Sequence, residues 1–426
     1  MILAALVCAM LVLLFLRVPV AISMLLPCLV YNVWQGIPGV ALQRCMASVG
    51  SPGAFPLLAV PLFVMTGYLS NAGGLADRLF RLLLCLFGRI PGSLAYVNVI
   101  SSLLFSWMSG AAIADAAGLG SVLVPAMKKR GYNEGFALGL TGASSLIGPI
   151  MPPSIPAIVY AVSAGVSVGS LFFAGVLPAL VLTAILCVYV FIDAKRNPLR
   201  DENSGPKIPL KTALMGALPV LLTPVIILGG ILGGVFTPTE AAAAAVMWVL
   251  FLSVCYRAIS FRGFYDVLLK TATTTGSIML IVSAAGLFSN VIAREQGPQA
   301  VTQAMLQLTD NPYVFLLLVN LALLVTGMLL EPVAGLLITV PVLLPASIEF
   351  GIDPLQLGIV MILNLVIGLL TPPVGLVLYV LSAVTGASVQ TVVRGTVPFL
   401  IPLLITMLLI TYVPAFSLWL PGFLGK

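Results

Sequence analysis

The chain has 426 residues, of which 61% are hydrophobic and 8% are charged, with a mean hydropathy of +1.19. These values exclude a water-soluble domain and predict an all-α protein that crosses a lipid bilayer many times, because each crossing takes about 20 apolar residues. The absence of histidine and the scattered positions of the six cysteines argue against metal clusters and Ser-His-Asp enzymes.

We expect residues 1–192 to cross the membrane five times and to hold one re-entrant helical hairpin. The predicted spans are 1–16, 18–34, 55–73, 136–163 and 171–192, and the hairpin covers 92–127. The span at 136–163 contains "GPIMPPSIP", whose prolines remove backbone donors and break a helix. Broken helices persist at membrane depth only where protein or a cavity receives the freed carbonyl groups, so the break is a candidate binding site.

A polar segment, "DAKRNPLRDENSGPKIPLK" at 193–211, predicts an exposed linker between two halves. The second half, 212–426, has predicted spans at 212–235, 238–256, 271–291, 355–384 and 396–419, and a hairpin at 312–347. The span at 355–384 is interrupted by "GLLTPPVG". Two further segments, "LADRLFRLLLCLFGRIPG" and "RAISFRGFYDVLLK", alternate basic and apolar residues and predict helices that lie at the membrane interface.

The two halves are internally similar. An offset of 220 residues places "VLVPAMKKRG" on "VLLPASIEFG" and the first proline break on the second without a gap, and an offset of 219 pairs "GYLSN" with "GLFSN". An odd number of spans in each half makes the two repeats opposite in orientation. Inverted-topology repeats of this kind are typical of secondary transporters.

The positive-inside rule gives the orientation. With the N-terminus and the C-terminus both outside, the linker is cytoplasmic and sixteen of the 19 Lys and Arg residues lie inside; only Arg44, Arg294 and Lys426 lie outside. The net charge of +6 is explained by these loops and by contact with anionic lipid, so it does not indicate a nucleic-acid partner.

The hairpin tips "SWMSGAAIAD" and "VTGMLLEPVAG" are expected to meet the two breaks near the middle of the membrane. Unwound carbonyls and helix C-terminal ends suit a hard cation such as Na⁺, and helix N-termini suit an anion. The alternative is a kink that serves only packing. The residues predicted to bind cations, two or more in total, are Ser106, Ser109, Gly148, Met151 and Pro153 in the first half, and Gly327, Gly368, Thr371 and Val374 in the second.

Ionisable residues at membrane depth are costly and therefore indicate function. Asp115 lies just past the first tip and Glu331 lies at the second, and both are predicted, with Ser109, to contact substrate. Arg294 is the fourth predicted substrate residue, because a guanidinium group binds a carboxylate through two hydrogen bonds; its alternative role is an interfacial anchor.

Four stretches carry a family resemblance: "SGAAIADAAGLGSVLVPAMKKRGY", "GPIMPPSIPAIVYAV", "NLVIGLLTPPVGLVLYV" and "VVRGTVPF". Through them the whole chain resembles the large membrane subunit of tripartite ATP-independent periplasmic (TRAP) transporters, the DctM family. The resemblance implies an elevator-type Na⁺/solute symporter in the bacterial inner membrane. It also implies a periplasmic substrate-binding protein, a small four-helix membrane subunit and an organic-acid substrate. Family members often carry a richer serine run where this chain has Ala111 and Ala112.

Other functions fit the sequence less well. A stand-alone Na⁺/dicarboxylate carrier of the related ion-transporter superfamily is the nearest alternative. A channel does not need paired hairpins and paired breaks. A membrane-embedded enzyme would need the histidines and metal ligands that the sequence lacks, and ATP drive would need a GxxxxGK[ST] loop.

Overall fold

The computed structural model describes residues 2–16, 18–88, 90, 92–197 and 209–424. Within these ranges it contains helices and no β-strand, and eight of the helices are long and apolar enough to cross a membrane. The predicted all-α, polytopic fold class is therefore confirmed. Most of the predicted linker at 193–211 lies outside the described residues.

The described residues of the first half form ten α-helices and one 3₁₀ helix. They are α1 (Ile2–Phe15), α2 (Val20–Trp34), α3 (Pro38–Gly50), η1 (Pro52–Leu58), α4 (Ala59–Ala72), α5 (Leu75–Phe87), α6 (Ser93–Ser109), α7 (Ala112–Lys129), α8 (Glu134–Ser145), α9 (Ile155–Ala164) and α10 (Val168–Arg196).

The second half begins with a helix interrupted by a π-helical turn. Its elements are α11 (Leu210–Pro224), η2 (Val225–Gly229), α12 (Gly230–Leu232), α13 (Pro238–Cys255), α14 (Phe261–Arg294), α15 (Gly297–Leu308), α16 (Pro312–Leu329), α17 (Pro332–Glu349), α18 (Pro354–Gly368), α19 (Leu376–Thr385), α20 (Val389–Tyr412) and α21 (Ala415–Leu424).

The order of helices recurs along the chain. Helices α16 to α20 begin 219 to 221 residues after α6 to α10, in the same sequence of hairpin, broken helix and long helix. The breaks fall between α8 and α9 and between α18 and α19, where the proline motifs stand. The packing crosses between halves, because α7 contacts α19 and α17 contacts α9.

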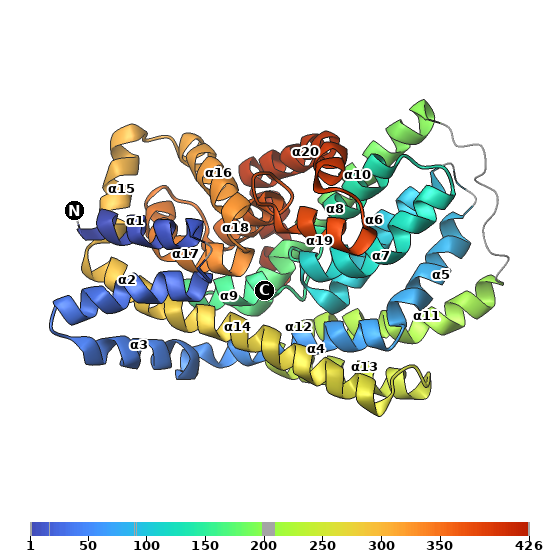
Figure 1. Ribbon diagram of the computed structural model, residues 1–426, viewed down its shortest axis with the longest axis horizontal. Helices are drawn as coiled ribbons and strands as arrows, with labels where there is room; N and C mark the ends of the chain where they lie inside the picture. Colours follow the sequence, from blue (N-terminus) through green and yellow to red (C-terminus); the bar gives the residue numbers. More distant parts are fainter. Residues whose placement is uncertain (1, 17, 89, 91, 198–208, 425–426) are drawn as a thin grey trace.

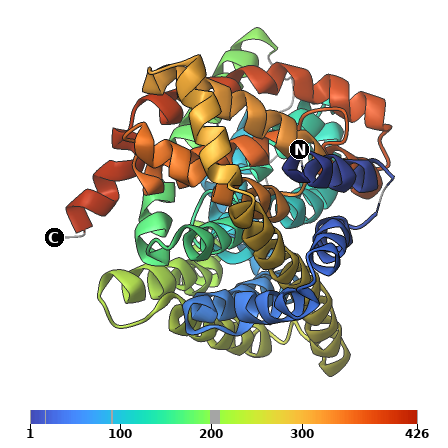
Figure 2. The ribbon, with the colours of Figure 1, turned by 90° about the vertical axis from the view of Figure 1, so that its left-hand side faces the viewer.

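Two groups of helices are visible in both views (Figure 1, Figure 2). Helices α3, α4, α13 and α14 lie along the lower side, and the hairpins and broken helices lie above them. Helix α14 runs the length of the lower group and contacts α2, α3, α4 and α17. Two hydrogen bonds help to hold it there: Tyr68 Oη to Thr274 Oγ1 at 3.0 Å, and Ser283 Oγ to the Cys45 carbonyl oxygen at 3.0 Å.

The segment "RAISFRGFYDVLLK" does not form a separate interfacial helix. The structure continues from Phe261 through the predicted span to Arg294 as one helix of 34 residues. Ser260 caps its start by accepting a hydrogen bond from the Gly263 N–H at 3.1 Å, and no proline follows until Pro298. Without a break the helix propagates, because each added residue contributes another backbone hydrogen bond.

Glycine allows α8 and α20 to pack backbone against backbone. A Cβ atom at Gly139 would overlap the Gly395 carbonyl group and the ring of Phe399, and a Cβ atom at Gly395 would overlap Gly135. Close approach through small residues is a common way for helices to associate in membranes.

We expect Gly139→Ala to lower the free energy of unfolding by about 1–3 kcal/mol, because the methyl group would push α8 and α20 apart. Gly276→Ala is the matched control, since nothing lies within 4 Å of a Cβ atom at this exposed position of α14. Thermal unfolding of the purified variants in detergent measures the difference. Equal Tm values for both variants would contradict tight packing between α8 and α20.

Candidate functional site

The first hairpin turns at Gly110, between α6 and α7. Gly110 has a φ of +60°, a left-handed conformation that glycine adopts readily, and its N–H donates to the Ser106 carbonyl oxygen at 3.2 Å. A Cβ atom at this position would overlap the carbonyl oxygen of Pro153. The tip of the first hairpin therefore lies directly against the first break.

The first break is a buried, non-helical segment, residues 146–154. Its exit is capped by Ser154, whose Oγ accepts from the Ala157 N–H at 3.1 Å and donates to the Pro149 carbonyl oxygen. No described donor bonds to the carbonyl oxygens of Gly148, Met151 or Pro153. Such free carbonyls at membrane depth need another partner, and a cation is one that they can coordinate.

Asp115 lies in the first turn of α7 with no solvent exposure. Ser109 Oγ donates a hydrogen bond to Asp115 Oδ1, whereas Oδ2 has no hydrogen-bond partner among the described residues. A Cβ atom at Gly148 would lie 2.5 Å from Oδ2. The structure thus brings Asp115, Ser109 and Gly148 together between the hairpin and the break.

Ser106 is also buried beside this group, but its hydroxyl is turned toward its own helix. Its Oγ donates to the Leu103 carbonyl oxygen at 2.5 Å. The described contacts therefore connect Ser109, and not the Ser106 hydroxyl, to Asp115.

A buried polar network that we did not predict joins α6 to α8. Asn98 Nδ2 donates to Thr141 Oγ1 at 2.7 Å, and Ser144 Oγ donates to Asn98 Oδ1 at 3.1 Å. Ser102 Oγ donates to Ser144 Oγ at 2.9 Å. Polar residues in otherwise apolar spans were the available signal, since such side chains usually bond across helices in a membrane.

The second half has its own network at related positions. Asn364 Nδ2 donates to Asn320 Oδ1 at 2.8 Å, which links α18 to α16. Asn320 Nδ2 donates to Thr411 Oγ1 at 3.2 Å, which adds α20.

The second hairpin turns through Leu330 and Glu331, and α17 begins at Pro332. Glu331 is half-buried and is the residue that precedes the first turn of α17. A negative charge on Glu331 at this helix N-terminus would be stabilised by the helix dipole.

The second break covers residues 369–375 and also touches its hairpin. The backbones of Gly327 and Gly368 are in contact, and the Gly375 N–H donates to the Met328 carbonyl oxygen at 3.5 Å. Thr371 and Val374 lie in the non-helical segment, where Thr371 Oγ1 donates to the Ile367 carbonyl oxygen at 3.0 Å. The predicted residues of the second half thus lie in one tip and one break.

Arg294 is not joined to either tip by any described hydrogen bond or ion pair. It is the exposed last residue of α14. Its neighbour Glu295 accepts a hydrogen bond from Tyr31 Oη at 2.5 Å, which ties this end of α14 to α2.

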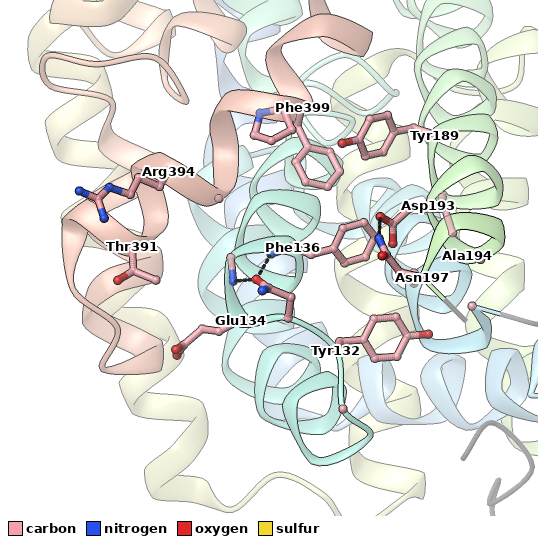
Figure 3. Close-up of a pocket in the computed structure, with 18 residues that line it drawn as sticks. Tyr132, Glu134, Phe136, Tyr189, Asp193, Ala194, Asn197, Thr391, Arg394 and Phe399 are labelled. Atoms are coloured by element: carbon pink, nitrogen blue, oxygen red, sulfur yellow. Dashed lines mark hydrogen bonds between the residues drawn. The ribbon is translucent and has the colours of Figure 1, made fainter. Parts of the chain in front are cut away.

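A cavity of about 730 Å³ lies away from the two tips, between α8, α10 and α20 (Figure 3). Its walls include Tyr132, Asp193, Arg394 and Phe399, and none of the described residues that line it belongs to the predicted site. This cavity is therefore separate from the arrangement of tips and breaks.

Comparison with known proteins agrees with this architecture. Residues 7–416 match the family described as the tripartite ATP-independent periplasmic transporter, DctM component. The chain is 43% identical over 418 residues to the sialic acid TRAP transporter large permease protein SiaM of Vibrio cholerae, covering 97% of each chain. It is 41% identical over 375 residues to the C4-dicarboxylate TRAP transporter large permease protein DctM of Pseudomonas aeruginosa, covering 87% of each.

A solved structure shares the fold at low sequence identity. The YdaH transporter of Alcanivorax borkumensis superposes with a TM-score of 0.62 at 14% identity, over 89% of this chain and 87% of the other. Family match, relatives and fold agree. The chain belongs to the DctM family, the large membrane component of tripartite ATP-independent periplasmic (TRAP) transporters.

Proposed function

We propose that this chain is the transport subunit of a Na⁺-coupled importer for a small organic acid. As a TRAP large permease it is a transporter component and not an enzyme. The observation that carries the proposal is the contact between the Gly110 tip and a buried segment of carbonyl groups, beside the carboxylate of Asp115.

Cation binding at the breaks is supported by the chemistry of the groups that meet there. Carbonyl and hydroxyl oxygens with a carboxylate are hard ligands that suit Na⁺. Among the described residues no cluster of three or more His, Cys, Asp or Glu is present that would hold a transition metal. Each of the two breaks is met by a hairpin tip, which supports two or more coupling ions.

A carboxylate substrate is supported by the helix ends at the same level. Helices α7 and α17 begin at the two tips, and α9 and α19 begin at the two breaks. Their N-terminal N–H groups carry partial positive charge and attract anions. The names of the two relatives given above refer to sialic acid and to C4-dicarboxylates, which both carry carboxylates.

The partners follow from family membership. We propose a periplasmic binding protein that delivers the organic acid and a small four-helix membrane subunit that completes the scaffold. The location is the bacterial inner membrane, with both termini periplasmic. The alternative is a carrier that acts alone.

The first test concerns coupling. We expect uptake of a carboxylate into proteoliposomes to require a Na⁺ gradient, because the cation neutralises buried negative charge before the tips close. Radiolabelled sialic acid and succinate are suitable probes. Uptake that is undiminished when K⁺ or choline replaces Na⁺ would contradict the proposed Na⁺ coupling.

The second test concerns the partners. We expect the chain alone to transport slowly and to reach its full rate only after its binding protein and small membrane subunit are added. Reconstitution of each combination at equal protein content measures this dependence. A full rate from the chain alone would establish the stand-alone carrier.

The third test concerns the two acids. We expect Asp115→Asn and Glu331→Gln to insert and purify normally but to reduce uptake at least about tenfold, equivalent to roughly 1.4 kcal/mol. An acid that served only packing would be replaced without loss, since removing an unneeded buried charge lowers the desolvation cost.

Exposed acids supply the controls for this comparison. Asp77 and Glu349 are both exposed, and Glu349 ends the same helix that Glu331 precedes. Asp77→Asn and Glu349→Gln are expected to keep the wild-type rate. Wild-type rates in Asp115→Asn and Glu331→Gln would show that neither acid takes part in transport.

A further inference from the structure

We propose that the Asp115 carboxylate is a direct ligand of the cation at the first break and does not contact the substrate. This inference rests on the proposed Na⁺ coupling and deepens it. The sequence alone predicts that Asp115 contacts the substrate, whereas we propose that it binds the cation. The two breaks then differ in their chemistry.

The first argument is the position of the free oxygen. Asp115 Oδ2 is buried without a hydrogen-bond partner among the described residues, and it lies against Gly148. The missing side chain of Gly148 leaves the space that the carboxylate occupies. The Gly148 and Met151 carbonyls, which accept no described hydrogen bond, belong to the same buried segment, so we infer that they share a cation with Oδ2.

The second argument is charge. The ion pair described in the structure joins Lys128 to Glu134 at 2.6 Å, and no described Lys or Arg bonds to Asp115. An ionised carboxylate at membrane depth is costly unless a positive partner compensates it. A bound monovalent cation supplies that charge, whereas an anionic substrate in contact with Oδ2 would add repulsion.

The third argument is access. Asp115 has no solvent exposure, and Ser109 covers its other oxygen from the hairpin side. A substrate with several polar groups needs a larger opening than one buried oxygen atom provides. An ion without its water shell needs far less room than such a substrate.

The second break lacks the same chemistry. The residue that corresponds to Asp115 at the offset of 220 is Gly335, and a Cβ atom there would lie 2.7 Å from Leu365 Cδ2. The side chain of Leu365 thus packs against the position that would carry the second acid. The residues of the second break are also less buried, since Pro372 and Pro373 are exposed. A cation at that break would meet neutral oxygens, and the nearest acid in the sequence of this hairpin is Glu331 in the turn itself.

This inference can be tested by measuring how Na⁺ binding changes the thermal stability of the purified protein, an assay that does not depend on transport. NaCl is titrated against choline chloride at constant ionic strength, and Tm is recorded in detergent. We expect Na⁺ to raise the Tm of the wild-type protein, because a ligand that binds only the folded state stabilises it. In Asp115→Asn the half-saturating Na⁺ concentration should rise at least about tenfold, and in Asp77→Asn it should be unchanged.

A second variant covers the case in which Asp115→Asn does not fold. Gly148→Ala keeps the charge but places a methyl group 2.5 Å from Oδ2, so it must displace the carboxylate. We expect the half-saturating Na⁺ concentration of Gly148→Ala to rise at least about tenfold, as in Asp115→Asn. A normal Na⁺ response in Asp115→Asn, or in Gly148→Ala if the first variant is unfolded, overturns the inference and leaves the proposed function intact. If neither the Tm nor the uptake rate of the wild-type protein depends on Na⁺, the inference and the proposed Na⁺ coupling are both wrong.

Discussion

Backbone groups inside a membrane must find partners, and the structure of this chain depends on how it meets that requirement at two broken helices. Between α8 and α9 the buried carbonyls of Gly148, Met151 and Pro153 receive no described hydrogen bond. The hairpin tip at Gly110 packs directly against this segment, although it donates no described hydrogen bond to these three carbonyl groups. A helix that was continuous here would satisfy its own carbonyls and would leave nothing for an ion to bind.

Glycine makes this closure possible because each tip approaches its break at backbone distance. Gly110 meets Pro153 in the first half, and Gly327 meets Gly368 in the second. Side chains at these positions would hold the tips away from the carbonyls. The buried networks of Asn98 with Thr141 and of Asn320 with Asn364 then fix each hairpin to the helix that leads into its break. Close approach and polar cross-links together set the geometry of both sites.

The sequence was most informative where the physical cause is local. Proline and glycine act on their own turn of helix, so the tips, the breaks and their duplication could be predicted from motifs. Contacts between distant residues could not: Asn98 and Thr141 are 43 positions apart, and nothing in either segment identifies the partner. The exposure of Arg294 and the unbroken course of α14 likewise depend on tertiary packing, which the spacing of charges does not encode.

Each hairpin packs against the broken helix of the other half, so the two breaks are linked mechanically even though their residues differ. Helix α7, which carries Asp115, contacts α19 beyond the second break, and α17 contacts α9 beyond the first. A hairpin that moved to admit an ion at one break would therefore shift its contacts with the broken helix of the other half. Two sites are coupled when both bias the same packed element, and the coupling is reciprocal. If Na⁺ binds at the first break as we propose, an ion that settles the first tip would also favour one position of the second, and cation and substrate would depend on each other without touching.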